Sequence, residues 1–287
     1  MIADTATTSA RAEDPVAALR LFCFHHAGGR ETAFLGWQKR LGARAEVIPV
    51  RLPRPEDVSP EGPGGSGMSM AQVVAAIDHD IGPLLRRPFI FYGHSMGALV
   101  AYHLTRLRQS CGRSLPERLL VGAYPAPHLP HRLADCAHLP DEDLLALLPP
   151  QPALHSHLLH QAPGLAAAAA ARLRLHLGLC DSVAPAESNR PECTGHGFPQ
   201  RVSDPLRCPV DVFTGISDPL VTVAEAAAWR HHTRAGCRVH RLPGGHFFTR
   251  ETPESKAAFF NRLCAVLAKA SEWAADGLWP APVTVAS

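Results

Sequence analysis

Short apolar runs alternate with longer amphipathic segments along most of this chain of 287 residues. Helical periodicity is clear from an N-cap at Ser69 through residue 85, again over 96–107, and over 253–270. Between these segments lie runs with the length and apolar character of strands buried on both faces, at residues 19–24, 46–50, 89–92, 119–123, 209–214 and 238–242. This order predicts an α/β protein in which a mostly parallel sheet is covered by helices on both faces.

The alternation stops between residues 128 and 204, where helical stretches separated by prolines take its place. In open α/β sheets, ligands bind at the carboxyl ends of the strands, and an insertion of this kind commonly covers that edge. We therefore expect residues 17–127 and 205–272 to form the core, and 128–204 to form a helical lid with a Pro- and Gly-rich connector. Residues 1–16 and 273–287 are expected to be flexible tails.

Composition excludes several classes of protein. Hydrophobic residues make up 46% and charged residues 19% of the chain, which is typical of a folded domain and not of a disordered one. The formal net charge is +2 without a dense basic run, so nucleic acid is not an expected partner. Neither a signal peptide nor a bilayer-spanning segment is visible, and we expect a soluble, cytoplasmic protein with no membrane partner.

Cysteine and histidine spacing does not indicate a metal site. The eight cysteines contain no C-x-x-C pair, so neither a zinc ribbon nor a dense disulfide framework is predicted. Cys193 and His196 lie close together, but no further clustered ligands complete a site. The adjacent His25 and His26 point to opposite faces of an extended chain, which disfavours a shared metal ion. We expect no metal.

A candidate nucleophile lies between a buried strand and a helix. Residues 93–97 read Gly-His-Ser-Met-Gly and directly follow the strand at 89–92. This strand–turn–helix setting is the one in which a G-x-S-x-G pattern forms a nucleophile elbow, where a strained turn exposes the serine hydroxyl. Ser95 is therefore the predicted nucleophile.

A serine nucleophile needs a general base and a carboxylate that orients it, and in this fold they follow the serine in the order acid, then histidine. Asp218 follows the strand at 209–214, and His246 follows the strand at 238–242, so both lie on loops at carboxyl ends of strands. Asp211 lies inside a strand and Asp204 precedes one, so neither is expected to reach the site. The predicted triad is Ser95, Asp218 and His246.

The oxyanion of a tetrahedral intermediate requires backbone N–H donors, one after the serine and one on the loop after an early strand. Met96 and Ala27 occupy these positions, and Ala27 is followed by Gly28 and Gly29, which let the backbone approach a substrate. A dinucleotide or P-loop site is not indicated, because a third glycine and a P-loop lysine are missing. The neighbouring residues predicted to bind substrate are His26, Gly28 and Phe247.

Taken together, these motifs resemble those of the type II thioesterases, free-standing α/β-hydrolases that accompany polyketide and nonribosomal peptide synthetases. The resemblance spans residues 19 to 270. Its parts are Leu21-Phe22-Cys23-Phe24 with Ala27-Gly28-Gly29, Phe34 and Trp37, Arg87-Pro88, Tyr92 to Ala98, Ala126-Pro127-His128, Leu139-Pro140-Asp141, Ser217 to Val221, and Gly244 to Phe248.

The resemblance implies hydrolysis of acyl groups from the phosphopantetheine arm of an acyl or peptidyl carrier protein, through an acyl-Ser95 intermediate. It implies no cofactor of the enzyme itself, and we expect a monomer. Departures such as His25 and His103 lie where the family usually has proline and an acidic residue, and they remove no catalytic group. Two alternatives remain open: an acyltransferase or cyclase that uses the same triad with an amine or hydroxyl acceptor, and a non-catalytic module that binds the carrier protein.

Overall fold

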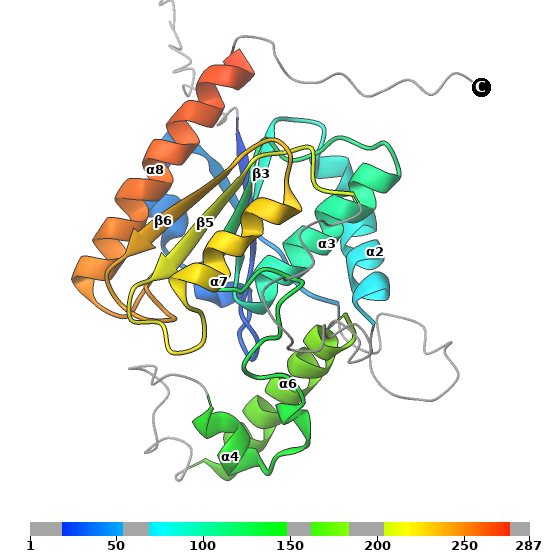
Figure 1. Cartoon of the computed structure of the whole chain (residues 1–287), viewed down its shortest axis with the longest axis vertical. Helices are drawn as coiled ribbons and strands as arrows, with labels where there is room; N and C mark the ends of the chain where they lie inside the picture. The colour runs from blue at the N-terminus through cyan, green and yellow to red at the C-terminus, as the bar shows by residue number, and fades with distance from the viewer. Residues whose placement is uncertain (1–18, 54–68, 148–161, 184–203, 276–287) are drawn as a thin grey trace, which may run out of the picture.

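Six parallel strands form the centre of the computed structural model, which describes residues 19–53, 69–147, 162–183 and 204–275 (Figure 1). Each strand pairs with its neighbours in parallel, in the order β2-β1-β3-β4-β5-β6. The predicted parallel sheet is confirmed, and every expected strand is present within two residues of its expected limits. The strands are β1 (Arg20–Phe24), β2 (Glu46–Pro49), β3 (Phe89–His94), β4 (Leu119–Gly122), β5 (Val210–Gly215) and β6 (Cys237–Leu242).

Helices cover both faces of the sheet because successive strand side chains point to opposite sides. Phe22 and Phe24 of β1 pack with α2 (Met70–Ile81) and α3 (Met96–Ser110), while Leu21 and Cys23 face α1 (Trp37–Leu41) and α8 (Pro253–Ala275). In Figure 1, α8 and the pair α2 and α3 lie on opposite sides of the strands. The remaining short helices of the core are η1 (Glu31–Phe34), η2 (Gly42–Arg44), η4 (Gly82–Leu84), α7 (Val223–Ala227) and η7 (Ala228–His232).

The first helix of the core begins where the sequence predicts. The Ser69 hydroxyl accepts a hydrogen bond from the Gln72 N–H at 3.3 Å, and the Gln72 side chain accepts one from the Ser69 N–H at 3.0 Å. This reciprocal capping satisfies two N–H groups that the first helical turn leaves without partners. Further along α2, the buried Asp78 accepts hydrogen bonds from Arg108 and Arg113, which ties α2 to α3.

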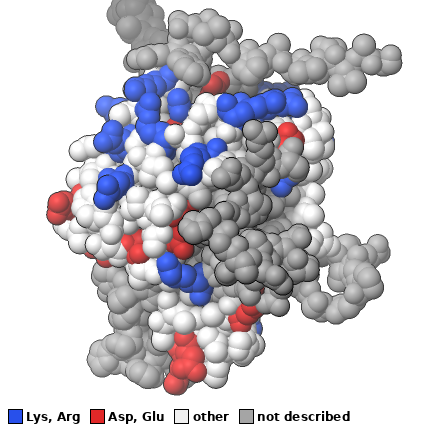
Figure 2. All heavy atoms as spheres, viewed as in Figure 1, with Lys and Arg blue, Asp and Glu red and all other residues white. Residues whose placement is uncertain are grey.

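Two helices of the predicted lid are described, α4 (Asp141–Ala146) and α6 (Pro163–Asp181), with the short η5 (Cys136–His138) between β4 and α4. Figure 1 shows α4 and α6 together beyond one end of the sheet, and α6 also contacts α3. The alanine-rich run at residues 166–171 and the apolar stretch at 173–179 form one continuous helix, α6. Figure 2 shows acidic side chains at the tip formed by α4, whose first turn carries Asp141, Glu142 and Asp143.

Several predictions fall on segments outside the described residues. They are the N-terminal tail, most of the Pro- and Gly-rich connector (residues 181–203) with Cys193 and His196, and most of the C-terminal tail. Among the described helices, none combines the length and apolar character needed to cross a membrane. Within the same residues, no group of three or more His, Cys, Asp or Glu side chains is arranged to hold a metal ion.

Candidate active site

The Gly-His-Ser-Met-Gly segment forms a sharp turn between β3 and α3. Ser95 has φ 53° and ψ −125°, a positive φ that L-residues adopt only under strain. Its N–H donates a hydrogen bond to the carbonyl oxygen of Gly122 at 2.7 Å, which anchors the turn to the neighbouring strand β4. The strained turn therefore holds the serine at the carboxyl end of β3, as expected for a nucleophile elbow.

Both glycines of the segment are required because backbone atoms approach them closely. A Cβ on Gly93 would lie 2.2 Å from the carbonyl oxygen of Gly97, and a Cβ on Gly97 would lie 2.1 Å from the carbonyl oxygen of Phe24. Since these neighbours are backbone atoms of the sheet and of the elbow itself, they cannot rotate away. The elbow is thus held tightly between β3, α3 and the end of β1.

We expect Gly97→Ala to lower the free energy of unfolding by about 3 kcal/mol, because the methyl group overlaps the backbone of Phe24. Urea unfolding measures the change. Gly178→Ala is the matched control: Gly178 lies within α6 with open space around its Cβ position, so alanine should leave stability equal or slightly higher. If the Gly97→Ala protein were as stable as the wild type, the close approach of Gly97 to the Phe24 carbonyl would be wrong.

The three predicted triad residues meet at one point of the structure. The Ser95 hydroxyl lies 3.0 Å from His246 Nε2, and His246 Nδ1 lies 2.9 and 3.1 Å from the two carboxylate oxygens of Asp218. His246 is only 3% exposed. With Nδ1–H donating to the carboxylate, Nε2 carries the lone pair that can accept the serine proton.

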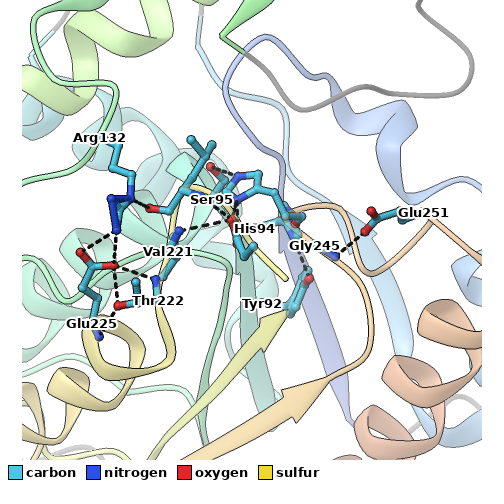
Figure 3. A network of polar contacts seen from close by, with 12 residues as sticks. Tyr92, His94, Ser95, Arg132, Val221, Thr222, Glu225, Gly245 and Glu251 are labelled. Carbon is cyan, nitrogen blue, oxygen red and sulfur yellow. Dashed lines mark hydrogen bonds and ion pairs between the residues drawn. The ribbon is translucent and has the colours of Figure 1, made fainter. Parts of the chain in front are cut away.

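The loops that carry the acid and the base are fixed by the backbone. Asp218 Oδ1 accepts hydrogen bonds from the N–H groups of Leu220 and Val221, at 2.8 and 3.2 Å. The N–H of Gly245 donates to the Glu251 carboxylate, which holds the loop before His246 (Figure 3). These contacts keep both side chains in place before any substrate binds.

His94, the second residue of the elbow segment, links it to the histidine loop. Its Nε2–H donates to the carbonyl oxygen of His246 at 2.9 Å, so Nδ1 accepts the hydroxyl proton of Tyr92 at 3.0 Å. Burial lowers the pKa of His94 well below its ordinary value, which keeps the ring neutral. Figure 3 shows Tyr92 and His94 on the strand side of Ser95. Tyr92 and His94 lie in the segment that carries the family resemblance, but their hydrogen bonds are not predicted, because a residue type alone does not reveal a partner 152 positions away.

A pocket opens beside the triad and includes both predicted oxyanion residues. Among the described residues, the N–H groups of Ala27 and Met96 have no hydrogen-bond acceptor. Two of the predicted substrate-binding residues line the same pocket, whereas Gly28 does not and instead lines an adjoining hollow. The lining residues are His26, Ala27, Ser95, Met96, Ala123, Tyr124, Pro125, His131, Arg132, Leu133, Leu177, Cys180, Leu220, Val221, His246 and Phe247.

The helical insertion contacts the site at two points. His176 of α6 accepts a hydrogen bond from the Gly28 N–H at 2.9 Å, next to the predicted oxyanion donor Ala27. Arg132 donates to the carbonyl oxygen of Leu220 at 3.1 Å and pairs with Glu225 at 3.4 Å, beside the loop of the triad carboxylate (Figure 3). The insertion therefore supports both the oxyanion loop and the acid loop, a role that the sequence does not reveal for His176 or Arg132.

Several buried or half-buried histidines of the chain are held in the neutral state. Burial, with nearby positive charge, lowers the pKa of His103 to about 4 and that of His176 and His232 to about 3. His232 also makes buried hydrogen bonds with the hydroxyl of Tyr102 at 2.8 Å and the ring of His128 at 2.7 Å. Protonation of such rings removes an acceptor and places a charge in a buried site.

We expect the free energy of unfolding to fall as the pH is lowered from about 6.5 toward 4. In this range the unfolded chain binds protons at these histidines and the folded chain does not, so each contributes up to about 1.4 kcal/mol per pH unit. Urea unfolding at a series of pH values measures the slope. His176→Asn should reduce it, whereas replacing the exposed His79 by glutamine should not. A free energy that stays constant between pH 7 and 5 would contradict the expectation.

The strand order, the elbow after β3 and the loop positions of the acid and base define the α/β-hydrolase fold. Comparison with known proteins agrees with this class. The thioesterase domain family matches residues 19–264. The gramicidin S biosynthesis protein GrsT of Aneurinibacillus migulanus is 31% identical over 251 residues, which cover 88% of this chain and 90% of that protein.

Solved structures show the same relationship. The RedJ thioesterase from the prodiginine biosynthetic pathway of Streptomyces coelicolor superposes with a TM-score of 0.66 at 30% identity, covering 92% of this chain and 96% of that one. The type II thioesterase BorB from the borrelidin biosynthetic cluster superposes with a TM-score of 0.65 at 26% identity, covering 91% and 95%. The chain belongs to the thioesterase family and is a thioester hydrolase. Its predicted resemblance to the type II thioesterases is confirmed.

Proposed function

We propose that this enzyme releases acyl groups from the phosphopantetheine arm of an acyl or peptidyl carrier protein, for editing or product release in polyketide or nonribosomal peptide synthesis. The observation that carries the proposal is the hydrogen-bonded chain from Asp218 through His246 to Ser95 beside a pocket with two backbone N–H donors. Further support comes from relatives named for gramicidin S, prodiginine and borrelidin biosynthesis.

In the first half of the reaction, the Ser95 oxygen attacks the thioester carbonyl carbon while His246 Nε2 accepts the serine proton. The negative charge that develops on the carbonyl oxygen is stabilised by the N–H groups of Met96 and Ala27. The C–S bond then breaks, and the proton on His246 passes to the leaving sulfur. The products of this half are acyl-Ser95 and the free thiol of the arm.

In the second half, a water molecule takes the place of the thiol. His246 accepts a proton from the water as it attacks the acyl-Ser95 ester, and the same N–H groups stabilise the second oxyanion. The ester bond breaks, Ser95 regains its proton from His246, and the free acid leaves. Asp218 keeps the imidazole in the required tautomer throughout and stabilises its positive charge. These steps use only groups of the chain and water, and the proposal assigns the enzyme no cofactor.

The proposal is tested with an acyl-loaded carrier protein incubated with wild-type enzyme. Intact-protein mass spectrometry follows loss of the acyl group from the carrier, and the released small molecule is analysed separately. We expect the free carrier and the free acid. Ser95→Ala is the matched control, and with it the acyl group should remain on the carrier.

Other outcomes point to the alternatives. Release of the acyl group as an amide, ester or lactone would show that an amine or hydroxyl captures acyl-Ser95, which makes the enzyme a transferase or cyclase. Carrier proteins that bind the enzyme but keep their acyl groups across a series of chain lengths would favour the non-catalytic binding module.

A further inference from the structure

Three hollows adjoin one another along the loop that follows β1. The first contains Ser95 and has a cavity of about 40 Å³. The second, of about 270 Å³, shares His26 and Ala27 with the first. The third, of about 610 Å³, shares Gly29, Arg30 and Arg172 with the second. The shared residues place the three hollows in a row, and this path runs from the nucleophile, past the loop after β1, to the widest of the three.

The two ends of this path differ in chemistry. The walls of the first hollow include the apolar side chains of Ala123, Leu133, Leu177 and Val221. Its arginine, Arg132, pairs with Glu225 and donates to the Leu220 carbonyl. Arginines line the other two: Arg30 and Arg172 face both, Arg250 lines the second and Arg51 lines the third. Glu31, in the third hollow, is the acidic residue among their lining residues. The outer part of the path therefore carries an excess of positive charge.

Arg30 and Arg172 lie close enough to repel each other. Partial burial, and after it the charge of Arg30, lowers the pKa of Arg172 from its ordinary value. Within the described part of the chain, neither guanidinium forms an ion pair with a carboxylate. An anion bound between the two guanidinium groups would be attracted to both and would offset their mutual repulsion. Guanidinium groups match phosphate oxygens in geometry and charge.

The position of the thioester determines which end of the substrate enters which hollow. Its carbonyl oxygen must point to the N–H groups of Ala27 and Met96. Both residues line the first hollow, and Ala27 also lines the second. The acyl chain and the thiol arm leave the carbonyl carbon in different directions. An apolar acyl group fits the first hollow, and the polar arm, which ends in a phosphate, fits the second and third.

We propose that Arg30 and Arg172 bind the phosphodiester of the phosphopantetheine arm, so that the arm enters along the β1 loop and the acyl group occupies the apolar pocket beside Ser95. This assignment rests on the proposed function, because it names the binding site for the arm of that substrate. Arg250 lines the second hollow and packs over the Phe247 ring at 4.6 Å. It therefore lies beside the path between the two arginines and Ser95.

The test compares two thioesters that differ only in the phosphate, butyryl-pantetheine and butyryl-4′-phosphopantetheine. For the wild type, we expect kcat/KM to be about tenfold or more higher for the phosphorylated substrate. The double variant Arg30→Gln/Arg172→Gln should reduce this ratio to about one. Because the ratio compares two substrates on the same enzyme, a general loss of folded or active protein cancels out.

Arg262→Gln is the matched control, since Arg262 is an exposed arginine on α8 and lines none of the three hollows; its ratio should equal that of the wild type. The proposal would be overturned if the wild type had nearly equal kcat/KM for the two substrates. It would also be overturned if the double variant had the same ratio of kcat/KM values as the wild type. An enzyme that hydrolyses neither substrate, or hydrolyses both without Ser95, contradicts the proposed function instead.

A direct binding measurement separates recognition of the phosphopantetheine arm from hydrolysis of the thioester. Calorimetric titration of the Ser95→Ala protein with 4′-phosphopantetheine, pantetheine and inorganic phosphate needs no turnover. We expect 4′-phosphopantetheine to bind most tightly of the three. When Arg30→Gln and Arg172→Gln are added to the Ser95→Ala protein, its affinity should fall to that of pantetheine. Equal affinity for phosphopantetheine and pantetheine would refute the site, and inorganic phosphate binding as tightly as phosphopantetheine would reveal a general anion site and not a site for the arm.

Discussion

Replacement of Ser95 by alanine is expected to lower kcat/KM for thioester hydrolysis by roughly 10⁵-fold or more, as loss of the nucleophile does in other serine hydrolases with this triad. The serine oxygen is the only atom of the triad placed to form the acyl intermediate, 3.0 Å from the His246 nitrogen that accepts its proton. Release of free thiol from butyryl-pantetheine, followed spectrophotometrically, measures the effect. The remaining activity would come from the oxyanion donors and from substrate binding.

The loss must come from chemistry and not from unfolding. Alanine and serine tolerate the positive φ of position 95 similarly, and the N–H that donates to Gly122 is retained. Thermal unfolding should therefore differ little from that of the wild type, within about 0.5 kcal/mol in stability. A Ser95→Ala enzyme that keeps a tenth of the wild-type activity would refute the acyl-Ser95 mechanism.

Replacement of Asp218 by asparagine is expected to lower kcat by about 10⁴-fold at neutral pH. The carboxylate accepts hydrogen bonds from His246 Nδ1–H and from the N–H groups of Leu220 and Val221. If the asparagine amide group faces His246, it donates to Nδ1, and the imidazole proton moves to Nε2. In that tautomer the ring cannot accept the proton of Ser95. Steady-state kinetics with butyryl-pantetheine measures the change.

The chain offers a matched control in a second aspartate–histidine pair. Asp211 of β5 has its Oδ1 2.7 Å from Nε2 of His240 in β6, and Arg118, just before β4, also donates to the Asp211 carboxylate at 2.5 Å. Asp211→Asn weakens this buried pair and should lower stability, yet kcat per folded molecule should stay within a few-fold of the wild type. Equal losses of kcat in Asp211→Asn and Asp218→Asn would contradict the assigned role of Asp218.

The Asp211–His240 and Asp218–His246 pairs also show how much of the site can be predicted from the sequence. Both connect β5 and its loop to β6 and its loop, and both consist of the same residue types. Only position relative to the strands separates them, because Asp211 and His240 lie within strands whereas Asp218 and His246 follow them. Strand ends are visible in the pattern of apolar runs, and parallel strands bring their carboxyl ends to one edge, so the meeting of Ser95, Asp218 and His246 is predictable from sequence.

Other features of the site depend on the path of the chain in three dimensions. The Gly28 N–H meets His176 across 148 positions, and His94 meets the His246 carbonyl across 152. Arg30 and Arg172 line the same hollow. None of these residues belongs to a local pattern that marks a partner. The sequence by itself determined the sheet, the turn at Ser95 and the loops that carry Asp218 and His246, because hydrophobic periodicity and turn chemistry act over a few neighbouring residues. Only the tertiary structure decided how the insertion supports the oxyanion loop and where positive charge gathers, because those contacts depend on how distant segments pack together.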